Sequence, residues 1–197
     1  AKLEIFTKEL LRIDSLLRTQ AIPAMELPKK NKRKGRSESS YQGRAMGGIL
    51  VIAKSEIEHC MGKLHPDGSK TGFMAKFRIY GPLQAYTFMA VYWPQPASDQ
   101  QIIESPAKAW AILQSWINKE NMRGSPTDWL KKVLSTWVTV AQSSGDIAVI
   151  LGDMNASETP TASGNYGTNG KLSELILKQL GMVSVQQKLM DVYQPTY

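Results

Sequence analysis

The chain has 197 residues, which is enough for one domain with a substantial core and short for two. Hydrophobic residues make up 42% and charged residues 21%, as in ordinary globular proteins, and no apolar run reaches the roughly 18 residues that a membrane helix needs. The single cysteine excludes an internal disulfide and favours a reducing, intracellular compartment, while the net charge of +7 favours polyanionic partners.

Most of the charge excess lies in a basic block near the N-terminus. Residues 1–50 contain 11 Lys and Arg against 5 Asp and Glu. Six of these cations are close neighbours: Lys29, Lys30, Lys32, Arg33, Lys34 and Arg36. Because the segment 29–46 is also rich in Ser and contains Gly, we expect it to be a basic loop within the domain. Such a block either attracts nucleic acid or is a solvated loop or localisation signal, and the sequence alone leaves these readings open.

The first predicted elements are a helix and two strands. Apolar residues recur at spacings of three and four over residues 3–19, which predicts an amphipathic helix. Residues 22–27 could form a short strand, although Pro23 weakens that prediction because proline cannot donate to a strand ladder. Residues 49–53 are a continuous apolar run that follows two glycines, which predicts a buried strand.

A hairpin is predicted in the middle of the chain. Apolar and polar residues alternate over residues 73–79, which is typical of a half-exposed strand. Residues 86–92 are rich in aromatic and β-branched types, which favours a buried strand. The Gly81-Pro82 turn between them predicts that the two strands pair antiparallel.

Helices and one further strand are predicted in the remainder. Residues 99–120 and 126–142 have helical apolar spacing, and Ser125 is a suitable N-cap for the second helix. Residues 147–151 predict another buried strand, and residues 171–180 predict a helix that ends at a glycine. Buried strands, a hairpin and intervening helices together favour a layered α/β domain without internal repeats.

The sharpest chemical feature is the sequence Gly152-Asp153-Met154-Asn155, which directly follows the last predicted strand. Glycine lets the backbone turn and leaves space for a substrate. In extended geometry Asp153 and Asn155 share a face, because one residue lies between them. A carboxylate that orients water, beside an amide that donates to a phosphoryl oxygen, suits hydrolysis of phosphate esters. A polar turn in which both side chains cap backbone groups is the alternative.

An apolar strand that ends in Gly-Asp-apolar-Asn resembles the endonuclease/exonuclease/phosphatase superfamily. This superfamily includes DNase-like nucleases, apurinic repair endonucleases and the endonuclease domains of non-LTR retrotransposons. Three other segments resemble family motifs in the expected order: Gly47-Gly48-Ile49-Leu50-Val51, Val91-Tyr92-Trp93-Pro94-Gln95, and residues 189–197 with Asp191-Val192 and Pro195-Thr196-Tyr197. The first two are most similar to the retroelement endonucleases. The resemblance covers about residues 3–197 and implies one domain with a four-layer α/β/β/α sandwich that lacks its terminal strands.

The resemblance also implies roles for particular residues. Asp153 resembles the family's aspartate that orients or activates the attacking water, and Asn155 resembles the asparagine that steadies the phosphate. Tyr92 resembles the strand-end tyrosine whose hydroxyl contacts the scissile phosphate. Gln95 stands where many members have asparagine, so it keeps the amide on a longer arm. Glu26 has the right order in the chain for the family's metal-binding glutamate, and a plain surface glutamate is the alternative.

Two expected family elements are not found in the sequence. An early strand with an active-site asparagine is not visible, and no histidine follows Asp153, since His59 and His65 both precede it. The resemblance therefore implies a truncated or degenerate copy of a longer domain.

The implied function is a Mg²⁺- or Mn²⁺-dependent endonuclease that cuts DNA. A retroelement origin implies a reverse transcriptase domain in the same polyprotein and a nuclear location. The alternatives are a catalytically impaired nucleic-acid-binding remnant of the fold and a phosphodiesterase acting on lipids or small molecules.

Overall fold

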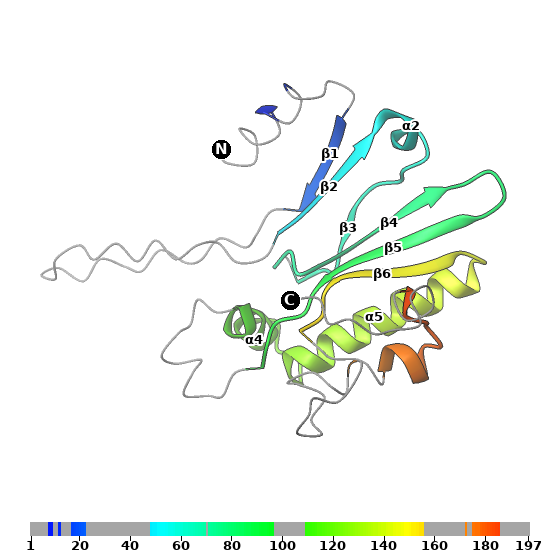
Figure 1. Cartoon of the computed structure of the whole chain (residues 1–197). Helices are drawn as coiled ribbons and strands as arrows, with labels where there is room; N and C mark the ends of the chain where they lie inside the picture. The colour runs from blue at the N-terminus through cyan, green and yellow to red at the C-terminus, as the bar shows by residue number, and fades with distance from the viewer. Residues whose placement is uncertain are drawn as a thin grey trace, which may run out of the picture.

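The computed structural model contains two sheets and a set of helices on one side of the larger sheet (Figure 1). The structure describes residues 8–9, 12, 17–22, 48–69, 71–96, 109–155, 172 and 175–185. The smaller sheet pairs two strands antiparallel: β1 (Leu17–Ile22) and β2 (Ile49–Lys54). The larger sheet has four strands in chain order: β3 (His65–Pro66), β4 (Met74–Tyr80), β5 (Ala85–Tyr92) and β6 (Ile147–Asp153).

The β4–β5 hairpin is confirmed. The two strands pair antiparallel over their full length, and the Gly81 backbone N–H closes the turn on the Gln84 carbonyl at 3.1 Å. Phe77 and Phe88 are register partners whose rings stack with centroids 5.3 Å apart. The prediction that β4 is half-exposed is only partly right. Met74 belongs to the face predicted to be polar, yet it is completely buried against the helices.

Two helices connect β5 to β6, which run parallel to each other. They are α4 (Ala109–Lys119) and α5 (Pro126–Ser143), and Figure 1 shows α5 lying along β6. A capping box between Ser125 and Asp128 begins α5, which confirms Ser125 as the N-cap. The helix ends at Ser143, and Gly145 follows the C-cap Ser144 with positive φ. The backbone N–H groups of residues 145 and 146 donate to the carbonyls of Gln142 and Ala141. Of the helix predicted at 99–120, residues 99–108 lie outside the described part.

The larger sheet packs on both faces. One face packs against α4, α5 and η1 (Leu175–Gln179) through a cluster that includes Met74, Met89, Leu113 and Leu134. The other face meets the smaller sheet through Leu64, Ala75 and Phe77, against which Ile22, Ile49 and Val51 pack. The described residues thus form a mixed α/β arrangement of three layers, as the α/β prediction requires. The four-layer sandwich stays a prediction.

Three sequence predictions need correction. The helix predicted over residues 3–19 does not extend through residue 17, because Leu17–Ile22 forms β1. The Gln20 side chain fixes this strand by accepting from Leu64 N at 2.8 Å and donating to Gly62 O at 3.3 Å. The apolar runs of β2 and β6 are strands but not buried ones, since both lie at sheet edges among the described residues. The helix predicted at 171–180 is a π-helix over its described turn, η1.

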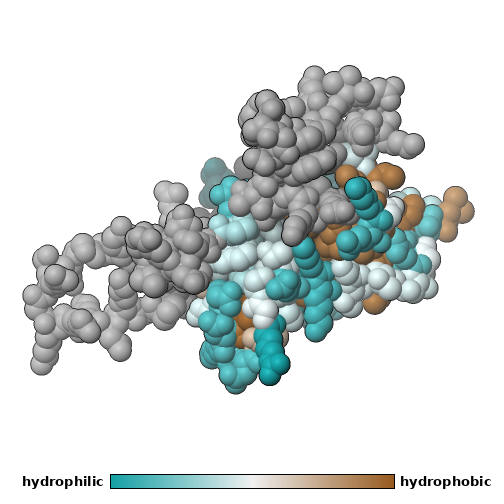
Figure 2. Space-filling model, turned by 90° about the horizontal axis from the view of Figure 1, so that it is seen from below, coloured by the Kyte–Doolittle hydropathy of each residue, from teal (hydrophilic) through white to brown (hydrophobic). Residues whose placement is uncertain are grey.

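The surface mixes hydrophilic and hydrophobic regions. In Figure 2 the hydrophobic atoms gather toward the right-hand side of the view. The exposed apolar residues include Leu83, Val140 and Ile147, from the β4–β5 turn, α5 and the start of β6. Within the described ranges, no helix is both long enough and apolar enough to cross a membrane.

Candidate functional site

The carboxyl ends of β5 and β6 lie side by side at one end of the larger sheet. Tyr92 and Asp153 are register partners in the parallel pair, and the Trp93 N–H donates to the Asp153 carbonyl at 2.8 Å. Both strands end on the left of the sheet in Figure 1. Active sites of open α/β sheets are commonly found beyond such strand ends, because a rigid sheet aims the side chains that follow.

Asp153 and Asn155 form a tight polar turn after β6. The backbone N–H of Asn155 donates to Oδ1 of Asp153 at 3.0 Å. This bond orients the carboxylate of Asp153, which is an exposed residue. The arrangement is an Asx-type turn, which is the geometry of the polar-turn alternative, and it engages only one of the two carboxylate oxygens.

Asn155 joins the two strand ends. Its Nδ2 donates to the Trp93 carbonyl at 2.7 Å, and its Oδ1 accepts from Nε2 of Gln95 at 3.3 Å. Its backbone φ is +46°, a left-handed conformation that asparagine tolerates better than most residues. The predicted substrate-binding Gln95 thus lies directly beside the predicted phosphate-steadying amide.

Tyr92 lies on the same face of the sheet as Asp153, because side chains of register partners project to the same side. Its ring packs edge-on against Phe73 with centroids 5.6 Å apart. The side chain is half-buried, and its hydroxyl forms no hydrogen bond to another described residue. The contact with Phe73 therefore holds the Tyr92 ring near the ends of β5 and β6.

The oxygen donors at this turn are of the kind that Mg²⁺ prefers. Mg²⁺ binds oxygen, keeps several waters and uses one or two protein carboxylates together with substrate phosphates. Asp153 supplies a carboxylate bonded to the Asn155 backbone, and the side-chain amides of Asn155 and Gln95 are bonded to each other. In the part of the chain that the structure describes, no three His, Cys, Asp or Glu side chains form a metal-binding group. The described residues thus fit a metal held by one carboxylate, water and substrate.

The other predicted site residues cannot be placed. The metal candidate Glu26 lies outside the described residues, and so do all six cations of the basic block: Lys29, Lys30, Lys32, Arg33, Lys34 and Arg36.

Sequence reasoning missed a second polar cluster at the opposite end of the sheet. Arg78 Nε donates to Asp146 Oδ2 at 2.7 Å, and the Thr87 hydroxyl donates to the same oxygen at 2.6 Å. The Arg78 guanidinium holds the pKa of the Asp146 carboxyl below its usual range, against the effect of desolvation. The partners come from three separate strands or strand starts, so no local pattern indicates the cluster. The only signal for this cluster in the sequence was a charged residue, Arg78, within a predicted strand of the hairpin.

A buried carboxyl lies on the β3 side of the sheet. Burial raises the pKa of Asp67, although the hydroxyl and backbone N–H of Ser69 donate to its oxygens and oppose the shift. Asp67 follows β3 and pairs with the start of β4, so β4 and β5 separate it from Asp153 at the edge of β6. We therefore interpret Asp67 as a loop-forming residue.

The link made by Asn155 leads to a stability prediction. We expect Asn155→Ala to lower the free energy of unfolding by about 1–2 kcal/mol, because it removes the bond to Trp93 O and places alanine at positive φ. Asn155→Gly should cost less, because glycine adopts that φ without the penalty of about 1 kcal/mol that alanine meets. Urea unfolding of the three proteins measures both effects. An Asn155→Ala midpoint equal to that of the wild type would show that the link does not hold the strand ends together.

Comparison with known proteins identifies no relative. No family model matches the chain, and neither the curated proteins nor the solved structures contain a match to it. Any assignment of function therefore rests on the residues and geometry described above.

Proposed function

We propose that the chain is a divalent-metal-dependent phosphodiesterase that hydrolyses DNA. The observation that carries the proposal is the meeting of Tyr92, Asp153 and Asn155 where β5 and β6 end together. Hydrolysis of a phosphodiester needs a group that orients water and donors that reach the phosphoryl oxygens. A carboxylate, a phenol and an amide supply these functions. The net charge of +7 supports a polyanionic substrate.

Each side chain has a separate task in the proposed reaction. The Asp153 carboxylate accepts a proton from the attacking water or orients it, and its bond to the Asn155 N–H keeps it aimed. Asn155 uses one amide hydrogen on the Trp93 carbonyl and retains a second for a phosphoryl oxygen. The Tyr92 hydroxyl donates to the same phosphate. Mg²⁺ or Mn²⁺ held by Asp153 would neutralise phosphate charge and polarise the ester.

A plasmid-nicking assay in Mg²⁺ tests the proposal. We expect slow nicking, because no histidine follows Asp153 in this sequence to serve as a further acid–base group. Asp153→Asn should reduce nicking to background, since Asp153 is the only charged residue in Gly152-Asp153-Met154-Asn155. Glu120→Gln is the matched control, because Glu120 is an exposed carboxylate just after α4. Nicking that survives Asp153→Asn, or that Glu120→Gln also abolishes, would contradict the assignment.

A DNA-binding titration at several salt concentrations separates this function from the alternatives. Six cations that contact B-DNA give a log–log slope of up to about −5, since each contact releases counterions. If binding depends steeply on salt but Asp153→Asn does not change nicking, an impaired nucleic-acid-binding remnant is favoured. Absent or salt-independent binding would favour a lipid or small-molecule phosphodiester as the substrate.

A further inference from the structure

A pocket of about 230 Å³ lies between the β3–β4 side of the larger sheet and the C-terminal half of α5. Six charged or titratable side chains line it: Lys63, His65, Lys76, Arg78, Tyr80 and Asp146. Asp146 directly precedes β6, whereas Asp153 ends it. Because β6 has seven residues and a strand rises about 3.3 Å per residue, the pocket is roughly 20 Å from the candidate site.

The pocket has an excess of positive charge. Its one acidic lining residue, Asp146, is buried and already bonded to Arg78 and Thr87 through both oxygens. Asp146 therefore offsets the charge of Arg78. Lys63 and Lys76 form no ion pair with any described residue. The lining thus contains two lysines that have no ion-pair partner among the described residues.

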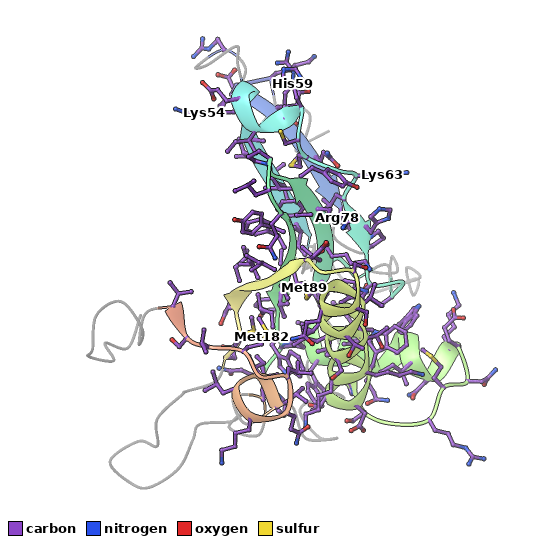
Figure 3. All side chains as sticks on the ribbon, turned by 90° about the vertical axis from the view of Figure 1, so that its right-hand side faces the viewer. Lys54, His59, Lys63, Arg78, Met89 and Met182 are labelled. Atoms are coloured by element: carbon purple, nitrogen blue, oxygen red, sulfur yellow. The ribbon has the colours of Figure 1, made fainter. Side chains whose placement is uncertain are left out.

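Two of the pocket's cations, Lys76 and Arg78, lie against aromatic rings. The Lys76 ammonium lies 5.4 Å from the centre of the buried Trp137 ring, and the Arg78 guanidinium lies 5.1 Å from that of Tyr80. These contacts fix the direction of both side chains. Figure 3 shows Arg78 close to the end of α5 and Lys63 extending outward from the ribbon, while Met89 lies deeper in the core.

We propose that this pocket binds a phosphate group. Lysine ammonium groups act as point charges for phosphate, and the planar guanidinium adds directed donors. Arg78 uses Nε and Nη2 on Asp146, so its Nη1 does not bond this carboxylate. The His65 imidazole adds a further polar group at the rim. The phosphate belongs either to a small phosphorylated compound or to a nucleic-acid backbone that passes this end of the sheet.

Titration with inorganic pyrophosphate at constant ionic strength tests the proposal. The readout is the indole N–H resonance of Trp137, assigned by its loss in Trp137→Phe. We expect a saturable shift in the wild type and an affinity at least tenfold lower in Lys63→Ala and in Lys76→Met, which keeps the apolar stem against Trp137. Lys119→Ala, an exposed lysine at the end of α4, is the control and should stay within twofold. The dispersion of the other indole resonances reports whether each variant is folded.

A competition experiment identifies the source of the phosphate. If a 20-base-pair duplex displaces pyrophosphate and binds more weakly to both lysine variants, the ligand is a nucleic-acid backbone. If it does not compete, the ligand is a small phosphorylated compound. A wild-type protein without a saturable shift, or lysine variants that bind like Lys119→Ala, would overturn the proposal. The titration involves no catalysis, so its outcome is independent of the nicking assay.

Discussion

Gly152→Ala is expected to lower the free energy of unfolding by several kcal/mol, because the new methyl group has no space. A Cβ at residue 152 would lie 1.9 Å from the Val91 carbonyl oxygen and 2.8 Å from its carbonyl carbon. Both are backbone atoms of β5, the strand that pairs with β6 in register at this residue. Relief therefore requires the two strands to separate. The backbone φ of +135° adds strain for any residue with a side chain.

Gly145→Ala is the matched control. Gly145 also has positive φ, +75°, but nothing lies within 4 Å of a Cβ placed there. It should cost only the conformational penalty, about 1 kcal/mol. Urea unfolding monitored by tryptophan fluorescence compares the two variants. Equal losses would show that φ, rather than the close approach of β5, is what requires glycine at residue 152.

Gly152 also connects stability to the candidate site. Asp153 is the next residue, and it pairs with Tyr92 only while β5 and β6 stay together. The glycine in the Gly-Asp-Met-Asn sequence is therefore needed for the strand pairing that brings the polar residues together. A Gly152→Ala protein that remained folded would be expected to lose the Asn155–Trp93 bond.

Elements with strong local signals were predictable. The start of α5 follows from Ser125, and the β4–β5 hairpin follows from alternation on either side of a Gly-Pro turn. These signals act within a few residues, so the sequence displays them directly. The strand-end position of Asp153 was predictable for the same reason, because the apolar run and the polar turn are adjacent.

Features set by distant pairing were not predictable. Residues 17–22 have helical spacing at their start, yet they form β1 by pairing with β2 across residues 23–48. The apolar run of β6 indicates a strand but not its place at the edge of the described sheet, where Leu151 is 44% exposed. The bond between Asn155 and Trp93 spans 62 positions, and that between Arg78 and Asp146 spans 68. Only the folded topology brings such partners together.

The Arg78–Asp146 pair should make stability depend on pH. Arg78 lowers the pKa of the folded Asp146 carboxyl, so the ionised form stabilises the fold. That stabilisation is present above the unfolded pKa, near pH 4, and is lost as pH falls through the lower folded value. At pH 7 we expect Asp146→Asn to cost about 2 kcal/mol, because the amide has one acceptor oxygen and no charge to pair with the guanidinium, while the 40% exposed Arg78 side chain is still solvated.

Urea unfolding of wild type and Asp146→Asn at pH 7 and pH 3 measures this effect. The difference between the two proteins should shrink at pH 3, because protonation removes the same charge from the wild type. Thr87→Val, which removes one hydroxyl and no charge, should cost about 1 kcal/mol. A difference for Asp146→Asn that is unchanged at pH 3 would show that the carboxyl acts there through its shape rather than its charge. In that case Asp146 would not neutralise Arg78, and the pocket beside it would hold a different balance of charge.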